Sequence, residues 1–214
     1  MTSRLDNFTD AAFAFAVSLL VIGGAGAPAS FDALVGALGD IPAFAFGFAV
    51  VVMFWMAHVR WRRLRGDGGV RSILLTLLLV FLMLIYIQPL RAMAAATGLW
   101  FTGQGGGFGG SLSGLFAVYG TGFLAMSLTM VALFADAAAN PGLDPEDWAG
   151  ARGERTIWLI LAATGIASIL VTMTPWGKWA AMLYATLPLT IGWFTWRFDW
   201  TGGKDLDEAA RAGD

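Results

Sequence analysis

The stretch RLDNFTDAAFAFAVSLLVI, residues 4–22, joins a charged entrance to an uncharged apolar run, and this combination decides how the chain begins to fold. Arg4, Asp6 and Asp10 lie at its start, and no further charge follows before Asp32. A membrane-spanning helix needs about 20 mostly apolar residues, which is close to the length of this run. The two acids argue against a cleaved signal peptide, whose charged region should be positive. We therefore expect a retained first spanning helix.

The composition of the whole chain is typical of an all-α protein that crosses a membrane several times. Of its 214 residues, 57% are hydrophobic and 13% are charged, whereas soluble domains carry about 25% charged residues. There is no cysteine and one histidine, which excludes disulfides, thiolate chemistry and a polyhistidine metal site within one chain. No basic tract indicates a nucleic-acid partner.

Segment lengths predict six spanning helices, at about residues 8–24, 41–60, 72–96, 112–135, 156–173 and 177–196. Pro89 is expected to bend the third of these helices. The remaining segments are a short interfacial helix at 31–39, a glycine-rich connector at 98–114 and one long hydrophilic loop at 136–155. Residues 1–200 would then form one six-helix domain, and residues 201–214 a flexible cytoplasmic tail.

The distribution of positive charge predicts that both termini are cytoplasmic. Lysine and arginine concentrate in cytoplasmic loops of membrane proteins. With six spans and both ends inside, only Arg91 and Lys178 of the 13 basic residues fall on the outer side. A missed or added span would destroy this separation.

Polar side chains at the predicted cytoplasmic level form the first candidate site. Arg4 and Asp10 lie at the start of the first helix, and Trp55 and His58 near the end of the second span. Since these two helix ends lie at the same level, the four side chains can meet. An indole N–H can donate to a carboxylate, and an imidazole can donate or accept. The cluster is either a structural anchor or a gating sensor.

An apolar stripe on the first helix forms the second candidate site. At 100° per residue, Phe15, Leu19 and Ile22 fall within about 60° of one another, and Asp10 lies about 140° from Phe15. Ser18 lies at the edge of the stripe. Spacing alone favours ordinary helix packing or lipid contact for these residues.

Three stretches of the sequence resemble a known family. Arg4 followed after three residues by Phe8, Thr9 and Asp10 is similar to the Arg, Phe-Ser-Asp signature in the first helix of the transmembrane protein 175 family of potassium channels. Trp55 and His58 match the Trp-His pair at the end of that family's second helix, and IQPL at 87–90 is similar to a Leu-Pro motif in its third.

The resemblance implies a potassium channel without a TVGYG filter, in the cell membrane of a prokaryote, and not an enzyme. A single six-helix repeat implies a homotetramer whose first helices line a central pore. Carried over to this sequence, the pore constriction is Phe15, Leu19 and Ile22, with Ser18 as a polar contact. A structural or gating network would consist of Arg4, Phe8, Thr9, Asp10, Trp55 and His58. The implied partners are potassium ions, lipid and other copies of the chain, with no cofactor and no resident metal.

Departures from the family pattern leave the ion selectivity open. Phe15 is larger than the usual isoleucine or leucine of the first layer, and Thr9 replaces the usual serine. A proton-conducting channel and a small cation transporter of the same fold are the alternatives. Asp136 and the segment DPED at 144–147 could suggest a cation site, although acids at a loop and helix start are more often solvated caps.

Overall fold

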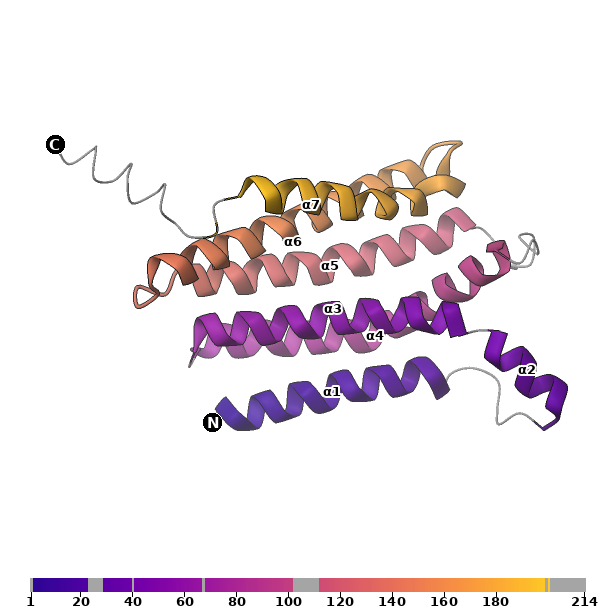
Figure 1. Cartoon of the computed structure of the whole chain (residues 1–214), viewed down its shortest axis with the longest axis horizontal. Helices are drawn as coiled ribbons and strands as arrows, with labels where there is room; N and C mark the ends of the chain where they lie inside the picture. The colour runs from indigo at the N-terminus through magenta and orange to yellow at the C-terminus, as the bar shows by residue number, and fades with distance from the viewer. Residues whose placement is uncertain are drawn as a thin grey trace.

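The computed structural model describes residues 2–22, 29–39, 41–66, 68–101, 112–198 and 200, and within these ranges all regular structure is helical. The elements are α1 (Thr2–Ile22), α2 (Phe31–Gly39), α3 (Ile41–Arg65), α4 (Val70–Phe101), α5 (Leu112–Ala138), α6 (Pro145–Thr172), the 3₁₀ helix η1 (Gly177–Thr186) and α7 (Leu187–Arg197). The long helices run side by side in an elongated bundle, with α1 at one edge and α7 at the other (Figure 1). The predicted tail at 201–214 lies outside the described residues, as does 102–111 of the predicted connector.

Four of the described helices are long and apolar enough to cross a membrane: α3, α4 over Val70–Met93, α5 and α6. The chain is therefore an all-helical, multi-pass membrane protein. The short helix predicted at 31–39 is confirmed as α2. The helix α4 runs through Pro89, and its last turns diverge from α3 (Figure 1).

The first helix begins earlier than its apolar run predicts. It starts at Thr2 rather than near residue 8, so its charged residues lie within the helix and not before it. Residues three and four apart share a helix face. Asp6, Thr9 and Asp10 are therefore presented together toward one side.

The prediction of a long hydrophilic loop at 136–155 is wrong. The helix α5 continues to Ala138 and α6 starts at Pro145, so only residues 139–144 connect them. Asp144 is the N-cap of α6, and its carboxylate accepts a 2.8 Å hydrogen bond from the backbone N–H of Asp147. A proline at the start and acids in the first turn favour a helix here, although the segment is polar. The solvated-cap interpretation of Asp144 is confirmed.

The last predicted span, 177–196, is not one α-helix. It consists of η1, which ends at Thr186, and α7, which begins at Leu187. Pro188 lies in the first turn of α7. Because proline has no backbone N–H, it cannot continue a hydrogen-bond ladder from the preceding helix but fits the first turn of a new one.

The core of the bundle lies between α3, α4, α5 and α6, and α1 packs on its outside against α3 and α4. Phe54, Trp61, Met126 and Trp158 are almost completely buried in this core. Leu20 of α1 lies directly over Gly47 of α3, since a Cβ added at Gly47 would meet its side chain at 2.9 Å. This close approach seats α1 on α3.

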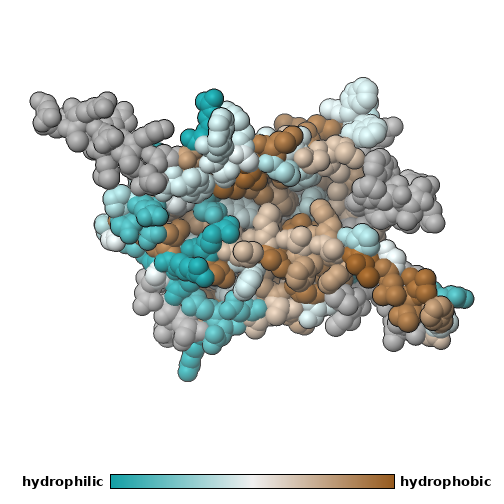
Figure 2. All heavy atoms as spheres, in the orientation of Figure 1, coloured by the Kyte–Doolittle hydropathy of each residue, from teal (hydrophilic) through white to brown (hydrophobic). Residues whose placement is uncertain are grey.

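Charged residues gather at one end of the bundle. Figure 2 shows hydrophilic side chains at the end where α1 begins and apolar ones along the middle. The end of α3, the starts of α4 and α6 and the end of α7 lie at the same end (Figure 1). Those arginines of the predicted inner side that lie in the described helices thus share one end of the molecule.

Candidate functional site: the polar anchor and the outer face of α1

The helix α1 has one covered face and one open face. Thr9, Phe13, Ala16 and Leu20 are buried against the rest of the chain, and their spacing of three or four residues defines a single stripe. Phe8 and Phe15 are 53% and 56% exposed, on the side turned away from the bundle. Packing within one chain therefore leaves an apolar face of α1 uncovered.

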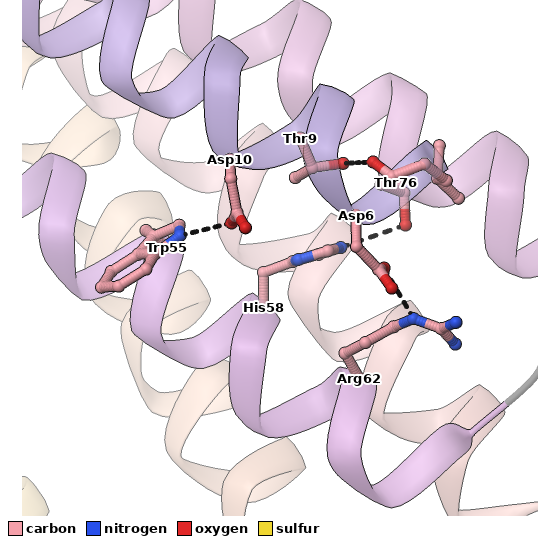
Figure 3. A network of polar contacts seen from close by, with 8 residues as sticks. Asp6, Thr9, Asp10, Trp55, His58, Arg62 and Thr76 are labelled. Carbon is pink, nitrogen blue, oxygen red and sulfur yellow. Dashed lines mark hydrogen bonds and ion pairs between the residues drawn. The ribbon is translucent and has the colours of Figure 1, made fainter. Parts of the chain in front are cut away.

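A hydrogen bond between Asp10 and Trp55 fixes α1 to α3. The indole Nε1–H of Trp55 donates to Oδ1 of Asp10 at 2.8 Å (Figure 3). A hydrogen bond to a carboxylate is shorter and stronger than one between neutral groups. The structure thus brings together these two residues as the sequence predicts.

A second tie joins Asp6 to Arg62, and sequence reasoning missed both residues. The guanidinium Nε–H of Arg62 donates to Oδ1 of Asp6 at 2.8 Å. Spacing could have found them: Arg62 follows Trp55 and His58 at intervals that place all three on one face of α3, and Asp6 shares its helix face with Asp10. Figure 3 shows both pairs side by side along the α1–α3 contact.

His58 binds α4 rather than α1. Its Nε2 lies 3.2 Å from the hydroxyl of Thr76, and both side chains are buried. The hydroxyl of Thr9, also buried, donates to the backbone carbonyl of Leu5 at 2.8 Å within α1. These polar groups therefore have partners, as polar groups at membrane depth usually do.

The structure does not bring Arg4 or Phe8 into this cluster. Both are exposed, and among the described residues no hydrogen bond or ion pair joins Arg4 to Asp10. Six residues separate Arg4 from Asp10, which is about 120° around the helix, so the two side chains leave different faces. The arginine that binds an aspartate of α1 is therefore Arg62, and not Arg4 as the sequence analysis expected.

The predicted constriction residues differ in how far the rest of the chain covers them. Phe15 is exposed, as is Ser18, whose hydroxyl donates to the carbonyl of Ala14 at 3.1 Å. Leu19 is half-buried and packs against the core. The side chain of Ile22 lies outside the described residues.

The structure gives no support for a cation site at Asp136 and the DPED segment. No group of three or more metal-ligating side chains occurs in the part of the chain that the structure describes. Asp136 is instead bound by Arg65 at 2.9 Å and by Ser72 at 2.6 Å. The carboxylate suggested for a cation site is occupied by protein groups.

These features define a class: a multi-pass helical membrane protein in which polar ties at a charged end anchor one peripheral helix, and that helix keeps an open apolar face. Residues 4–89 match the sequence profile of the family described as "Endosomal/lysosomal potassium channel TMEM175". A protein of Marivirga tractuosa named "Potassium channel" is 33% identical over 92 residues. These residues are 43% of this chain and 37% of that protein, so the chain spans little more than a third of that relative.

The fold of the whole chain has a solved counterpart. The crystal structure of a variant of the potassium channel MtTMEM175, in complex with a Nanobody-MBP fusion protein, matches with a TM-score of 0.78 at 24% identity. The match covers 90% of this chain and 91% of that chain. The first part of the chain is therefore similar in sequence to the TMEM175 family, and most of the chain has the same fold as the MtTMEM175 structure.

Proposed function

We propose that this chain is a potassium channel that passes monovalent cations down their gradient through a pore lined by α1. The observation that carries the proposal is the open apolar face of α1 bearing Phe15, on a helix whose start is held by Asp6 and Asp10. The family match and the names of the relatives support potassium as the ion that passes. Residues 1–200 act as one six-helix unit with both termini cytoplasmic, in the cell membrane of a prokaryote.

The open face of α1 would be covered by other copies of the chain in a homotetramer. Phe15, Leu19 and Ile22 would then form the constriction, with Ser18 as the polar contact beside it. An apolar ring can close a pore by expelling water, and selectivity then depends on pore size and on the lining dipoles. Trp55 ties α1 to α3 through Asp10, and His58 ties α3 to α4 through Thr76. Thr9 is hydrogen-bonded within α1. Arg4 and Phe8 belong to this network only by resemblance.

Substitution of Phe15 tests the gate. Phe15→Ala in liposomes should raise K⁺ flux by about tenfold or more, the effect of lowering the barrier by about 1.4 kcal/mol. Phe81→Ala is the matched control, because Phe81 is 61% exposed on α4 and no constriction is assigned to it. Equal flux in Phe15→Ala, Phe81→Ala and the unchanged chain would remove Phe15 from the pore.

The absence of cysteine allows a second test of the pore face. A thiol reagent applied from water should block current through Ser18→Cys but not through Leu128→Cys, whose exposed side chain lies on α5. Reversal potentials under K⁺, Na⁺ and H⁺ substitution separate a potassium channel from a proton channel or a coupled transporter. Native mass spectrometry in detergent should give four chains per particle.

A further inference from the structure

The last two turns of α3 carry three arginines that bind carboxylates on three different helices. Arg62 binds Asp6 of α1, Arg65 binds Asp136 of α5, and Arg60 binds Glu154 of α6 with its Nε 2.7 Å from Oε1. At 100° per residue, Arg62 and Arg65 lie about 60° apart around α3, whereas Arg60 lies about 160° from Arg62. The contacts to α1 and α5 therefore share one side of the same helical turn.

Asp136 is placed where its charge does not stabilise its own helix. It lies in the last turn of α5, where the helix dipole disfavours a negative group. It is also 8% exposed, so its carboxylate is largely removed from water. Such a group is tolerated when other residues bind it fully. Arg65 and Ser72 both donate to its Oδ2, and this contact is what Asp136 contributes to the fold.

The two partners of Asp136 stand on either side of the connection between α3 and α4. Arg65 is the last residue of α3, and Ser72 lies in the first turn of α4. Between them, Gly66 adopts a φ of 63°, and its N–H binds the carbonyl of Arg62 at 3.1 Å. The left-handed conformation favours glycine and ends a helix. The carboxylate of Asp136 thus joins the end of α3 to the start of α4, and the backbone of Arg62 is hydrogen-bonded at this same helix end.

We infer that Asp136 is a positioning residue for α1: through Arg65 and Ser72 it fixes the end of α3, and thereby sets Arg62 where it binds Asp6. The position of α1 depends in this way on a side chain of α5, whereas α1 itself packs mainly against α3 and α4. The effect on conduction rests on the proposed channel function, whereas the effect on the position of α1 does not.

A thiol-labelling experiment measures the position of α1 directly. Because the chain has no cysteine, Thr9→Cys places a single thiol at a position that is 1% exposed. A water-soluble maleimide then reports the opening of the start of α1 in reconstituted full-length protein. Asp136→Asn and Asp6→Asn should each raise the labelling rate by about tenfold, within the usual range of coupling between two sites.

The combination of the two substitutions distinguishes positioning from general stabilisation. If Asp136 acts through Arg62, the double variant Asp6→Asn with Asp136→Asn labels no faster than Asp6→Asn alone. Effects that multiply would overturn the inference, since sites without a shared partner are additive in free energy. Glu154→Gln is the matched control: it removes a charge bound to the opposite side of α3, from a pair whose arginine side chain is 45% exposed. It should change labelling less than about threefold and multiply with Asp6→Asn.

A second thiol site and a milder variant keep the test decisive if Asp136→Asn disturbs the whole bundle. Ala16→Cys is completely buried further along α1, and its labelling should stay unchanged. An equal rise in the labelling rate at Thr9→Cys and Ala16→Cys, in both Asp136→Asn and Ser72→Ala, would overturn the inference.

K⁺ flux is measured on the same samples. Absence of flux in the unchanged chain would refute the proposed function and leave the labelling result standing.

Discussion

The contact between Gly122 of α5 and the ring of Tyr86 of α4 makes a sharp prediction. A Cβ added at Gly122 would lie 2.5 Å from Cδ2 and 2.9 Å from Cε2 of that ring. Tyr86 is 1% exposed, so its ring has no free space into which to move. Small residues let membrane helices approach closely. Gly122→Ala should therefore separate α4 from α5 and destabilise the fold.

The magnitude follows from comparison with a glycine that has free space. Overpacking a tight core costs about 1–3 kcal/mol, while alanine gains up to about 1 kcal/mol over glycine in a helix. Gly192 of α7 has nothing within 4 Å of an added Cβ. Gly192→Ala therefore has only the stabilising effect of alanine in a helix. The difference in unfolding free energy between the two variants then gives the packing cost at Gly122. Gly122→Ala should be less stable than Gly192→Ala by about 1–3 kcal/mol.

Thermal unfolding of the detergent-solubilised protein measures this difference. For a chain of this length, about 1 kcal/mol corresponds to roughly 2–4 °C in Tm. Tyr86→Leu removes the ring, so the double variant with Gly122→Ala should lose less stability than the sum of the single variants. A Gly122→Ala protein with the Tm of Gly192→Ala would refute the close packing of α4 on α5.

Two further predictions concern the ends of α1 and α6. Trp55→Phe keeps an aromatic ring but removes the N–H that binds Asp10, so it should cost about 1 kcal/mol and lower K⁺ flux. Trp196→Phe, at a site that is 79% exposed, should leave both the Tm and the flux unchanged, and an equal loss in both variants would contradict the role of the bond. Asp144→Ala removes the N-cap of α6 and should cost about 0.5–2 kcal/mol of unfolding free energy, with Asp144→Asn recovering most of it. Equal Tm values for the two Asp144 variants would contradict the capping contact.

The polar contacts that anchor α1 on α3 are the pairs Asp10–Trp55 and Asp6–Arg62. Only the first pair was predicted from the sequence, because the residues of the two pairs differ in how unusual they are at their positions. Asp10 and Trp55 could be found because an acid and an indole in apolar helices are unusual and need partners. Asp6 and Arg62 are charged residues near helix ends, where charges are common, so their types alone carried no signal. Their spacing relative to Asp10 and His58 did carry one, because it places them on the same helix faces.

The boundaries of α1 and α6 were misjudged for one physical reason. Hydropathy locates the apolar part of a helix, whereas the helix itself continues as far as its backbone hydrogen bonds and caps allow. Asp144 and Pro145 start α6 well before its apolar run. The helix α1 likewise begins at Thr2. Capping signals, and not hydropathy, mark such ends.

The sequence by itself determined that the chain is a helical membrane protein, that most of its basic residues fall on one side of the predicted spans, and that α1 carries polar residues at its start and apolar residues beyond. These properties depend on composition and helical period, which are local. Only the tertiary structure decided that His58 binds Thr76, that Asp136 is buried between Arg65 and Ser72, and which face of α1 stays open. Each of these depends on the rotation and separation of packed helices, which close contacts such as that of Leu20 with Gly47 set across the bundle.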